Sequence, residues 1–367
     1  MKKFFQTFFL FCAITSSFIC NAQEQTISYV PFPLTMQDIT VDNKAIRYDG
    51  RFLIDKESAK FMYPGSTISL DFTGTTLKVK FNDALAYYHI TVDNNEPLKW
   101  CTSKFSEFQL NNLSNEKHNI TITLISEGIF RNPEFYGFAV EDKAVVSRPA
   151  DKKLRFEFIG NSITCGYGTE VTDRSPYNDS TSNFCHGFAY RTAQAFDADF
   201  MVVARSGIGI YRNYGDKDYA TAYGCMPDNY EKLWLDSPHK WDFSKFTPDV
   251  LFINLGTNDT WEMSSFNAEA YEKNYRKLMK TVLSHYPKVT IVLLTGSMMG
   301  TEALNAVKPI LDKIQADFTN KKHPVYRFDM TPSAGLGADW HPCAAQQEEM
   351  SKELIQFLTK SSIIPEK

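Results

Sequence analysis

Three residues in two short segments have side chains that together could hydrolyse an ester bond. Ser162 lies in the segment Gly-Asn-Ser-Ile-Thr, directly after a run of residues typical of a strand. His341 lies near the C-terminus, two residues after Asp339. A serine hydroxyl attacks well when a base removes its proton, and a carboxylate that accepts a hydrogen bond from the imidazole fixes the tautomer of that base. We therefore predict Ser162 as the nucleophile, His341 as the base and Asp339 as the acid that orients it.

Ester hydrolysis also requires hydrogen-bond donors for the negative oxygen that develops on the attacked carbonyl group. Asn258 lies in the segment Gly-Thr-Asn-Asp after a second strand-like run, and its side-chain amide could be one donor. The backbone N–H groups of Ser162 and of Gly207, which follows a third such run, are further candidates. Each has a structural alternative, since serine is a favoured helix cap and asparagine a common turn residue. We expect Asp259 to hold its loop through hydrogen bonds to nearby backbone.

The first half of the sequence is typical of a domain of short strands. Between about residues 25 and 148, apolar and polar residues alternate in several runs, which is the period of a strand with one buried face. Turn-forming residues such as Pro64-Gly65 separate the runs. The clearest runs cover residues 67–72, 77–81, 89–92 and 119–124. We predict an all-β sandwich of jelly-roll type over residues 23–148.

The pattern changes after a polar segment around Pro149. Strand-like apolar runs cover residues 154–159, 200–204, 250–255, 289–294 and 325–330. Between and after them, apolar residues at helical spacing predict helices over residues 268–285, 303–318 and 344–358. This alternation predicts a parallel sheet covered by helices, with its active site beyond the carboxyl ends of the strands. We therefore expect the candidate residues to converge in an α/β domain over residues 149–367.

The composition is that of an ordinary globular protein, with 43% hydrophobic and 22% charged residues in a chain of 367. The formal net charge of -4 gives no basic excess, so nucleic acid is not an expected partner. Five cysteines lie after residue 22, an odd number that leaves at least one unpaired within the chain. No C-x-x-C pair occurs, which argues against a zinc ribbon or a redox site. No disulfide pairing is assigned.

Residues 1–22 are typical of an export signal. Two lysines precede a short apolar run at residues 8–19, and small residues follow for cleavage after Ala22. The run is shorter than the usual membrane span of about 20 residues. We expect an exported protein, periplasmic or extracellular, with no integral membrane segment. Lipid attachment at Cys20 is an alternative that fits less well, because Ile19 directly precedes the cysteine.

Four segments resemble, in order, the four sequence blocks of the SGNH hydrolases. They are Gly160–Thr164, Ser206-Gly207, Gly256–Asp259 and Asp339–Pro342. The resemblance covers about residues 150–360 and implies a flavodoxin-like α/β/α fold, with an oxyanion hole formed by Ser162, Gly207 and Asn258. Asp339 precedes the histidine by two residues, where many of these enzymes have three. This spacing, the run at residues 160–168 and the preceding β domain resemble carbohydrate esterase family 2.

That resemblance implies removal of acetyl groups from plant polysaccharides such as xylan or glucomannan, with a preference for 6-position acetates and with no metal or organic cofactor. The expected partner is an acetylated polysaccharide or oligosaccharide. Trp261 and Trp340 could form apolar walls for an acetyl group or a sugar ring, although either indole could instead pack in the core. Some members of the family dispense with a true acid, which makes Asp339 the weakest of the three catalytic assignments.

Two other functions are compatible with these residues. The protein could bind glycans through a site that has lost its activity, with the β domain as a carbohydrate-binding module. The intact Ser162, His341 and Asp339 argue against that alternative. A lipase or thioesterase could use the same scaffold, but the sequence contains no long apolar segment for a lid. The sequence does not indicate the oligomeric state.

Overall fold

The computed structural model describes residues 35–93, 95–103, 106–217, 223–331 and 334–364. The expected export signal at residues 1–22 and the start of the expected sandwich, residues 23–34, lie outside these ranges. Among the residues within them, no helix has the length and apolar character needed to cross a membrane.

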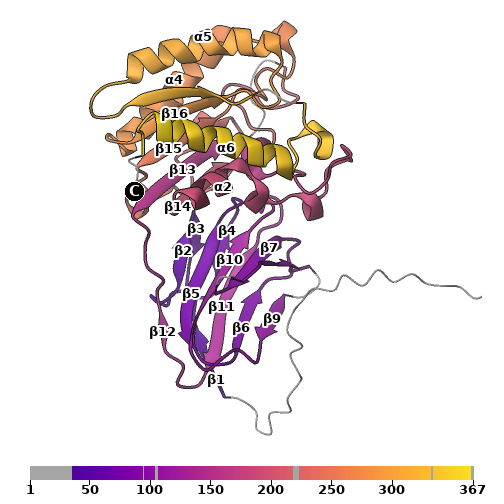
Figure 1. Ribbon diagram of the computed structural model, residues 1–367, viewed down its shortest axis with the longest axis vertical. Coiled ribbons are helices and arrows are strands. Elements are labelled where there is room, and N and C mark those ends of the chain that lie inside the picture. Colours follow the sequence, from indigo (N-terminus) through magenta and orange to yellow (C-terminus); the bar gives the residue numbers. More distant parts are fainter. Residues whose placement is uncertain (1–34, 94, 104–105, 218–222, 332–333, 365–367) are drawn as a thin grey trace, which may run out of the picture. The chain divides into compact units, whose positions relative to one another are not determined.

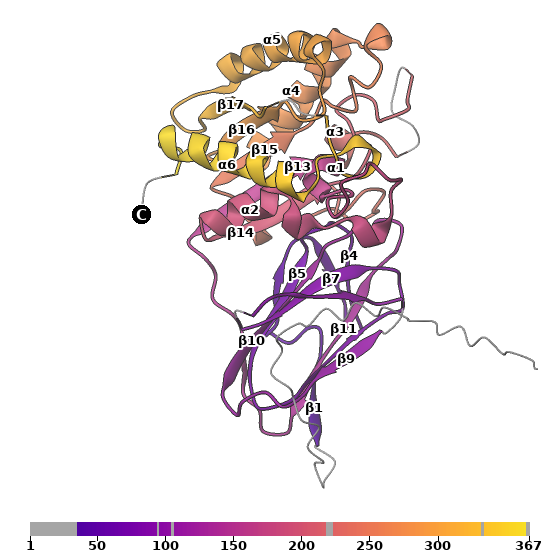
Figure 2. The ribbon, with the colours of Figure 1, turned by 45° about the vertical axis from the view of Figure 1, so that its right-hand side comes forward.

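The N-terminal domain is built from two antiparallel sheets (Figures 1 and 2). One sheet has the order β3-β4-β11-β6-β9 with β1 paired to β11, and the other has the order β12-β5-β10-β7-β8 with β2 paired to β5. The first contains β1 (Met36–Ile39), β3 (Phe52–Ile54), β4 (Ala59–Phe61), β6 (Leu77–Phe81), β9 (Glu107–Leu110) and β11 (Glu134–Glu141). The second contains β2 (Arg47–Asp49), β5 (Thr67–Thr73), β7 (Tyr87–Val92), β8 (Leu98–Cys101), β10 (Lys117–Leu124) and β12 (Val146–Ser147). The predicted all-β sandwich is confirmed.

The alternation of side chains explains which faces of these strands are buried. In β6, Leu77, Val79 and Phe81 are buried, while the two lysines between them are exposed. Leu70 and Phe72 of β5, in the other sheet, belong to the same apolar core. Successive side chains of a strand point to opposite faces, so the apolar set of each sheet is directed at its partner.

The second domain contains a five-stranded parallel sheet in the order β14-β13-β15-β16-β17. The strands are β13 (Leu154–Gly160), β14 (Ala198–Ala204), β15 (Val250–Asn254), β16 (Thr290–Thr295) and β17 (Val325–Asp329). This is the doubly wound order of flavodoxin-like folds, as predicted. The order reverses beside β13, and ligands of such folds bind outside the carboxyl ends of the strands at this reversal. The predicted domain boundary after residue 148 falls between β12 and β13.

Helices cover both faces of the parallel sheet (Figures 1 and 2). Helices α4 (Ala268–His285) and α5 (Thr301–Phe318) lie on one face, and α2 (Phe188–Ala195) and α6 (Ala344–Lys360) lie on the other. The helix predicted over residues 268–285 has the observed bounds, and α5 and α6 contain the other two predicted helices. Helix α2 and the short helices α1 (Ser162–Cys165) and α3 (Met226–Asn229) lie outside the predicted helix ranges, and four residues are too few to show helical periodicity.

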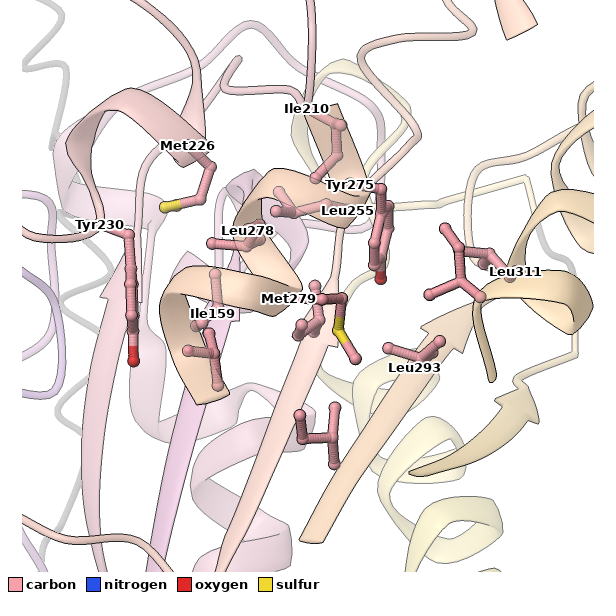
Figure 3. Close-up of a cluster of buried hydrophobic side chains, with 14 of the residues drawn as sticks. Ile159, Ile210, Met226, Tyr230, Leu255, Tyr275, Leu278, Met279, Leu293 and Leu311 are labelled. Atoms are coloured by element: carbon pink, nitrogen blue, oxygen red, sulfur yellow. The ribbon is translucent and has the colours of Figure 1, made fainter. Parts of the chain in front are cut away.

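Apolar side chains of α4 and α5 fill one face of the sheet (Figure 3). Leu278 and Met279 of α4 meet Ile159 of β13 and Leu293 of β16, and Leu311 reaches the same cluster from α5. These side chains are essentially inaccessible to solvent. Residues three and four apart lie on one side of a helix, so the apolar stripe of α4 is directed at the sheet.

The five cysteines after residue 22 are all free thiols.

Arg51 links the sandwich to the α/β domain. This residue lies between β2 and β3 in the sequence, and its side chain is completely buried. Nη1 donates to the carbonyl oxygens of Tyr230 and Lys232, each at 2.6 Å, and Nη2 lies 3.6 Å from Oε1 of Glu157 in β13. Burial raises the pKa of the Glu157 carboxyl to about 7, and the nearby Arg51 guanidinium opposes that shift.

Candidate active site

Ser162 is the first residue of α1 and follows β13 through a sharp turn. Asn161 caps the helix, because its side-chain oxygen accepts a hydrogen bond of 3.0 Å from the Ile163 N–H. A Cβ atom at Gly160 would lie 2.0 Å from Oγ1 of Thr164, so only glycine fits at the end of the strand. The helix-cap alternative for Ser162 is therefore wrong, since the preceding asparagine has that role. The Ser162 hydroxyl is available for another partner.

That partner is His341. Its Nε2 atom lies 2.8 Å from Oγ of Ser162, and its Nδ1 atom lies 3.0 Å from the carbonyl oxygen of Ala338. A carbonyl oxygen only accepts hydrogen bonds, so Nδ1 carries the ring proton and Nε2 accepts from the serine hydroxyl. This is the tautomer that a base needs in order to take the proton of Ser162.

Asp339 does not accept a hydrogen bond from the His341 ring, so the predicted geometry of this pair is wrong. Its Oδ2 atom instead accepts from the Tyr167 hydroxyl at 2.7 Å and from the Tyr177 N–H at 3.0 Å. The physical reason is the backbone, because Asp339 and Trp340 have φ values of 45° and 66° in the left-handed region. This turn brings the Ala338 carbonyl, and not the Asp339 carboxylate, to the imidazole.

Tyr167 connects Asp339 to the histidine. The Tyr167 ring stacks on the His341 ring at a centroid distance of 4.0 Å. The centroid of the Tyr177 ring lies 4.4 Å from that of Tyr167. An aromatic face attracts a cation, so Tyr167 can stabilise the imidazolium that forms during catalysis. Neither tyrosine was predicted from the sequence. Tyr167 lies within the run at residues 160–168, but spacing alone gives no sign that its ring stacks on a histidine.

Replacing Asp339 should therefore cost far less than the loss of a true triad acid. We expect Asp339→Asn to lower kcat/KM by about tenfold or less, whereas an acid bonded to the base contributes about 10⁴-fold in kcat. The measurement is the rate of ester hydrolysis, and Asp242→Asn is the control. Asp242 has a carboxylate that caps the short helix Phe243–Lys245. A loss of a thousandfold or more would contradict this arrangement and favour a direct role for the carboxylate.

The candidate oxyanion donors line the same cavity as Ser162. The side-chain amide of Asn258 donates one hydrogen to the carbonyl oxygen of Ile208 at 2.8 Å, which leaves its second hydrogen for another acceptor. Gly207 has a φ of 80°, a conformation that glycine adopts without strain, and its carbonyl accepts from the Tyr214 N–H at 2.8 Å. Among the described residues, the Gly207 N–H has no hydrogen-bond acceptor.

All seven predicted site residues line one cavity of about 800 Å³. They are Ser162, Gly207, Asn258, Trp261, Asp339, Trp340 and His341. They come from widely separated parts of the chain, and the carboxyl ends of the parallel strands bring them to one edge of the sheet. Met298, Met299 and Ala303 add apolar surface to the same cavity.

The two tryptophans are exposed in this cavity and do not pack in the core. Trp261 is 39% exposed and Trp340 is 56% exposed. The Arg174 guanidinium lies 3.8 Å from the ring centroid of Trp340, and the Tyr214 ring lies 5.6 Å from that of Trp261. These neighbours hold each indole on one side and leave apolar surface that could contact a ligand.

Asp259 has the structural position expected of it. It is fully buried, and its carboxylate accepts hydrogen bonds from the N–H groups of Ile210 and Tyr211 at 2.9 Å. Burial raises the pKa of this carboxyl to about 6, while the backbone donors oppose the shift. Asp259 thereby joins the Asn258 segment to the loop that follows Gly207.

A serine hydroxyl that is hydrogen-bonded to an imidazole, in a cavity lined by candidate oxyanion donors at the edge of a doubly wound sheet, defines a carboxylic ester hydrolase. Residues 158–354 match the GDSL-like lipase/acylhydrolase family, and residues 48–149 match the carbohydrate esterase 2 N-terminal domain. The first match covers more than half of the chain, so the chain belongs to the GDSL-like lipase/acylhydrolase family. Its two domains together are those of the family 2 carbohydrate esterases, which confirms the resemblance drawn from the sequence.

The relatives are named as esterases. The chain is 29% identical over 322 residues to the cellulase/esterase CelE of Acetivibrio thermocellus, a match that covers 85% of the chain and 39% of CelE. It is 26% identical over 332 residues to an acetylxylan esterase / glucomannan deacetylase of Cellvibrio japonicus, covering 84% of the chain and 89% of that protein. The chain thus spans well under half the length of CelE.

Solved structures share the fold. A family two carbohydrate esterase from Clostridium thermocellum, in complex with cellohexaose, superposes with a TM-score of 0.77 at 28% identity and covers 87% of the chain and 100% of that structure. A family two carbohydrate esterase from Cellvibrio japonicus gives a TM-score of 0.80 at 22% identity, covering 89% of the chain and 98% of that structure, and supports the fold alone.

Proposed function

We propose that this protein removes acetyl groups from the hydroxyls of plant polysaccharides such as xylan or glucomannan. The observation that carries the proposal is the 2.8 Å hydrogen bond between Nε2 of His341 and Oγ of Ser162, in a cavity with two exposed tryptophans. The names of the Cellvibrio japonicus relative and the cellohexaose bound to the Clostridium thermocellum structure support a carbohydrate ester as the substrate.

The proposed reaction has two halves. Oγ of Ser162 attacks the acetyl carbonyl carbon while Nε2 of His341 takes the hydroxyl proton. The imidazolium then gives that proton to the departing sugar oxygen, which leaves an acetyl group on the serine. Water attacks this acetyl-enzyme with His341 again as the base, and acetate is released. The Ala338 carbonyl holds the ring throughout, a role usually filled by a carboxylate.

The negative oxygen that forms in each half would be held by three donors. These are the N–H groups of Ser162 and Gly207 and the free amide hydrogen of Asn258. Such donors act strongly because they are already oriented and lie in a partly desolvated cavity. Trp261 and Trp340 would contact the sugar through their exposed faces, since C–H surfaces of sugars pack well on aromatic rings. Export by the signal at residues 1–22 would place the enzyme where plant polysaccharides occur.

The decisive experiment is a time course of acetate release from acetylated xylan, glucomannan and pectin, with 6-O-acetyl and 3-O-acetyl sugars as controls. We expect release from xylan or glucomannan and faster release from the 6-O-acetyl sugar. Faster hydrolysis of long acyl esters would favour a lipase or thioesterase instead. Binding to the polysaccharide without turnover would favour a glycan-binding protein.

Activity should persist below the ordinary pKa of histidine. Burial lowers the pKa of His341 from its usual value of 6.5, and hydrogen bonds to the backbone of Ala338 and Asp339, followed by the negative charge of Asp339, partly oppose this shift. The base is active when neutral, so a lowered pKa extends activity to more acidic solutions. We expect the acid limb of kcat/KM to have its midpoint below pH 6.5, and Asp339→Asn to move it lower still. A midpoint at or above 6.5 in the pH profile would contradict the assignment.

A further inference from the structure

The loop between β10 and β11 carries the sandwich domain to the edge of the active site. Ile125, just after β10, packs among the apolar side chains on the α2 and α6 face of the parallel sheet, and its carbonyl accepts from the Phe184 N–H at 2.9 Å. Arg131, near the end of the loop, forms an ion pair with Asp179 of the α/β domain, with 2.5 Å between Nη2 and Oδ2. The loop is therefore attached to the α/β domain at both of its ends.

Glu127 lies in the middle of this loop and binds Ser206 at two points. Oε1 accepts from the Ser206 N–H at 2.7 Å, and Oε2 accepts a short hydrogen bond from the Ser206 hydroxyl. Ser206 directly precedes Gly207, whose N–H is a candidate oxyanion donor. A charge-assisted pair of hydrogen bonds fixes both the position and the rotation of the residue that it holds.

We propose that Glu127 is a positioning residue, which holds Ser206 so that the next N–H, that of Gly207, is directed at the reacting carbonyl oxygen. The proposal rests on the oxyanion role given to Gly207 in the proposed function. It assigns the sandwich domain a part in catalysis that does not depend on glycan binding.

The contacts of the segment after Gly207 show why a residue of the sandwich domain is needed to position Ser206. The Gly207 carbonyl is held by the Tyr214 N–H, and the Ile208 carbonyl is held by the amide of Asn258, both at 2.8 Å. These contacts fix the chain after Gly207. The serine before it donates from both its N–H and its hydroxyl to Glu127.

The charges around Glu127 are compatible with a carboxylate so near a developing anion. Burial raises the pKa of the Glu127 carboxyl, and the hydrogen bonds from Ser206 and Cys165 and the charge of Arg205 oppose that shift. The uncharged side chains of Tyr167 and Tyr177 are its other titratable neighbours. Arg205 in turn lies 3.9 Å from the ring centroid of Tyr223. Both the burial of Glu127 and the nearby arginine weaken its repulsion of the oxyanion, so the side chain can act through Ser206.

The test compares Glu127→Ala, Glu127→Gln and Glu127→Asp with a matched control. Glutamine keeps an oxygen for the Ser206 N–H, aspartate moves the carboxylate by about 1 Å, and alanine removes both contacts. Glu141→Gln is the control, because Glu141 likewise accepts from the N–H (2.9 Å) and hydroxyl of one residue, Thr75, but within the sandwich. Each protein is assayed on 4-nitrophenyl acetate, with Tm measured in parallel.

We expect Glu127→Ala to lower kcat by about 10- to 100-fold with KM changed by less than about threefold, because a misplaced oxyanion donor weakens only the transition state. Glu127→Asp should lose at least about fivefold, and Glu127→Gln should recover most of the activity lost in the alanine variant. The control should keep its kcat. If the alanine variant does not fold, the aspartate variant decides.

Wild-type kcat in folded Glu127→Ala or in Glu127→Asp would overturn the positioning role and leave the proposed function standing. An equal loss in Glu141→Gln would also overturn it, because the effect would then be one of general stability. The assay uses a simple acetate ester, so a failure of the wild-type protein to act on polysaccharide would count against the proposed substrate alone.

Discussion

Ser162→Ala should lower kcat for 4-nitrophenyl acetate by about 10³-fold or more, while the protein folds normally. The hydroxyl lies 2.8 Å from the imidazole of His341 and has no structural part in its helix, because Asn161 supplies the cap. Its removal deletes the attacking atom and leaves the cavity, the oxyanion donors and the tryptophans in place. Steady-state kinetics on the purified variant, with circular dichroism to verify folding, measure the effect.

A matched control is Ser351→Ala, which removes a buried serine hydroxyl on α6 that donates to the Glu348 carbonyl one turn earlier. It should keep wild-type turnover. Near wild-type activity in Ser162→Ala would refute the assignment of the nucleophile and, with it, the proposed acetyl-enzyme. A binding measurement on acetylated xylan would then decide whether the variant still recognises the polysaccharide.

Arg51→Ala should lower the free energy of unfolding by about 3–5 kcal/mol. The substitution leaves the Glu157 carboxylate in strand β13 without its cation, and leaves the carbonyl groups of Tyr230 and Lys232 without their donor. A buried polar group without a hydrogen-bond partner destabilises the folded state by its full desolvation free energy. For a chain of this size we expect Tm to fall by about 4–7 °C in calorimetry or a thermal melt.

The pH dependence of this variant gives a sharper test. Without Arg51, the pKa of Glu157 in the folded state would lie further above the ordinary value of 4.5. The folded variant would then hold a proton that the unfolded chain releases, so its stability is present at low pH and lost as pH rises through the folded-state pKa. The Tm difference from wild type should therefore be larger at pH 8 than at pH 5.

Two controls separate this effect from the general loss of a charge. Arg148→Ala removes an arginine from an ion pair with Asp151 in which both side chains are nearly half exposed, and we expect a change within about 0.5 kcal/mol. Arg51→Met combined with Glu157→Gln should be more stable than Arg51→Met alone, because no charge is then left unpaired. Equal Tm values for Arg51→Ala and wild type would refute the linkage of the two domains through this residue.

Most of the fold could be predicted because its signals are local. The alternation of Leu77, Val79 and Phe81 with lysines predicted β6, and the apolar spacing in residues 268–285 predicted α4 with its observed bounds. The orienting role of Asp339 was the part of the site that failed. A spacing of two residues shows that a carboxylate is near a histidine, but the left-handed φ values at Asp339 and Trp340 decide which group reaches the ring.

The sequence by itself determined the class of the protein and the residues that meet at its site. Ser162, Gly207, Asn258 and His341 each follow a strand of one parallel sheet, and the carboxyl ends of parallel strands share an edge, so their convergence follows from the order of the elements. Only the tertiary structure decided what supports them. The Ala338 carbonyl on His341, the Tyr167 ring stacked on it, and the Glu127 and Arg51 contacts depend on backbone angles and on packing between segments far apart in the chain. No periodicity or motif encodes such contacts, because each is fixed by the surrounding fold and not by neighbouring residues.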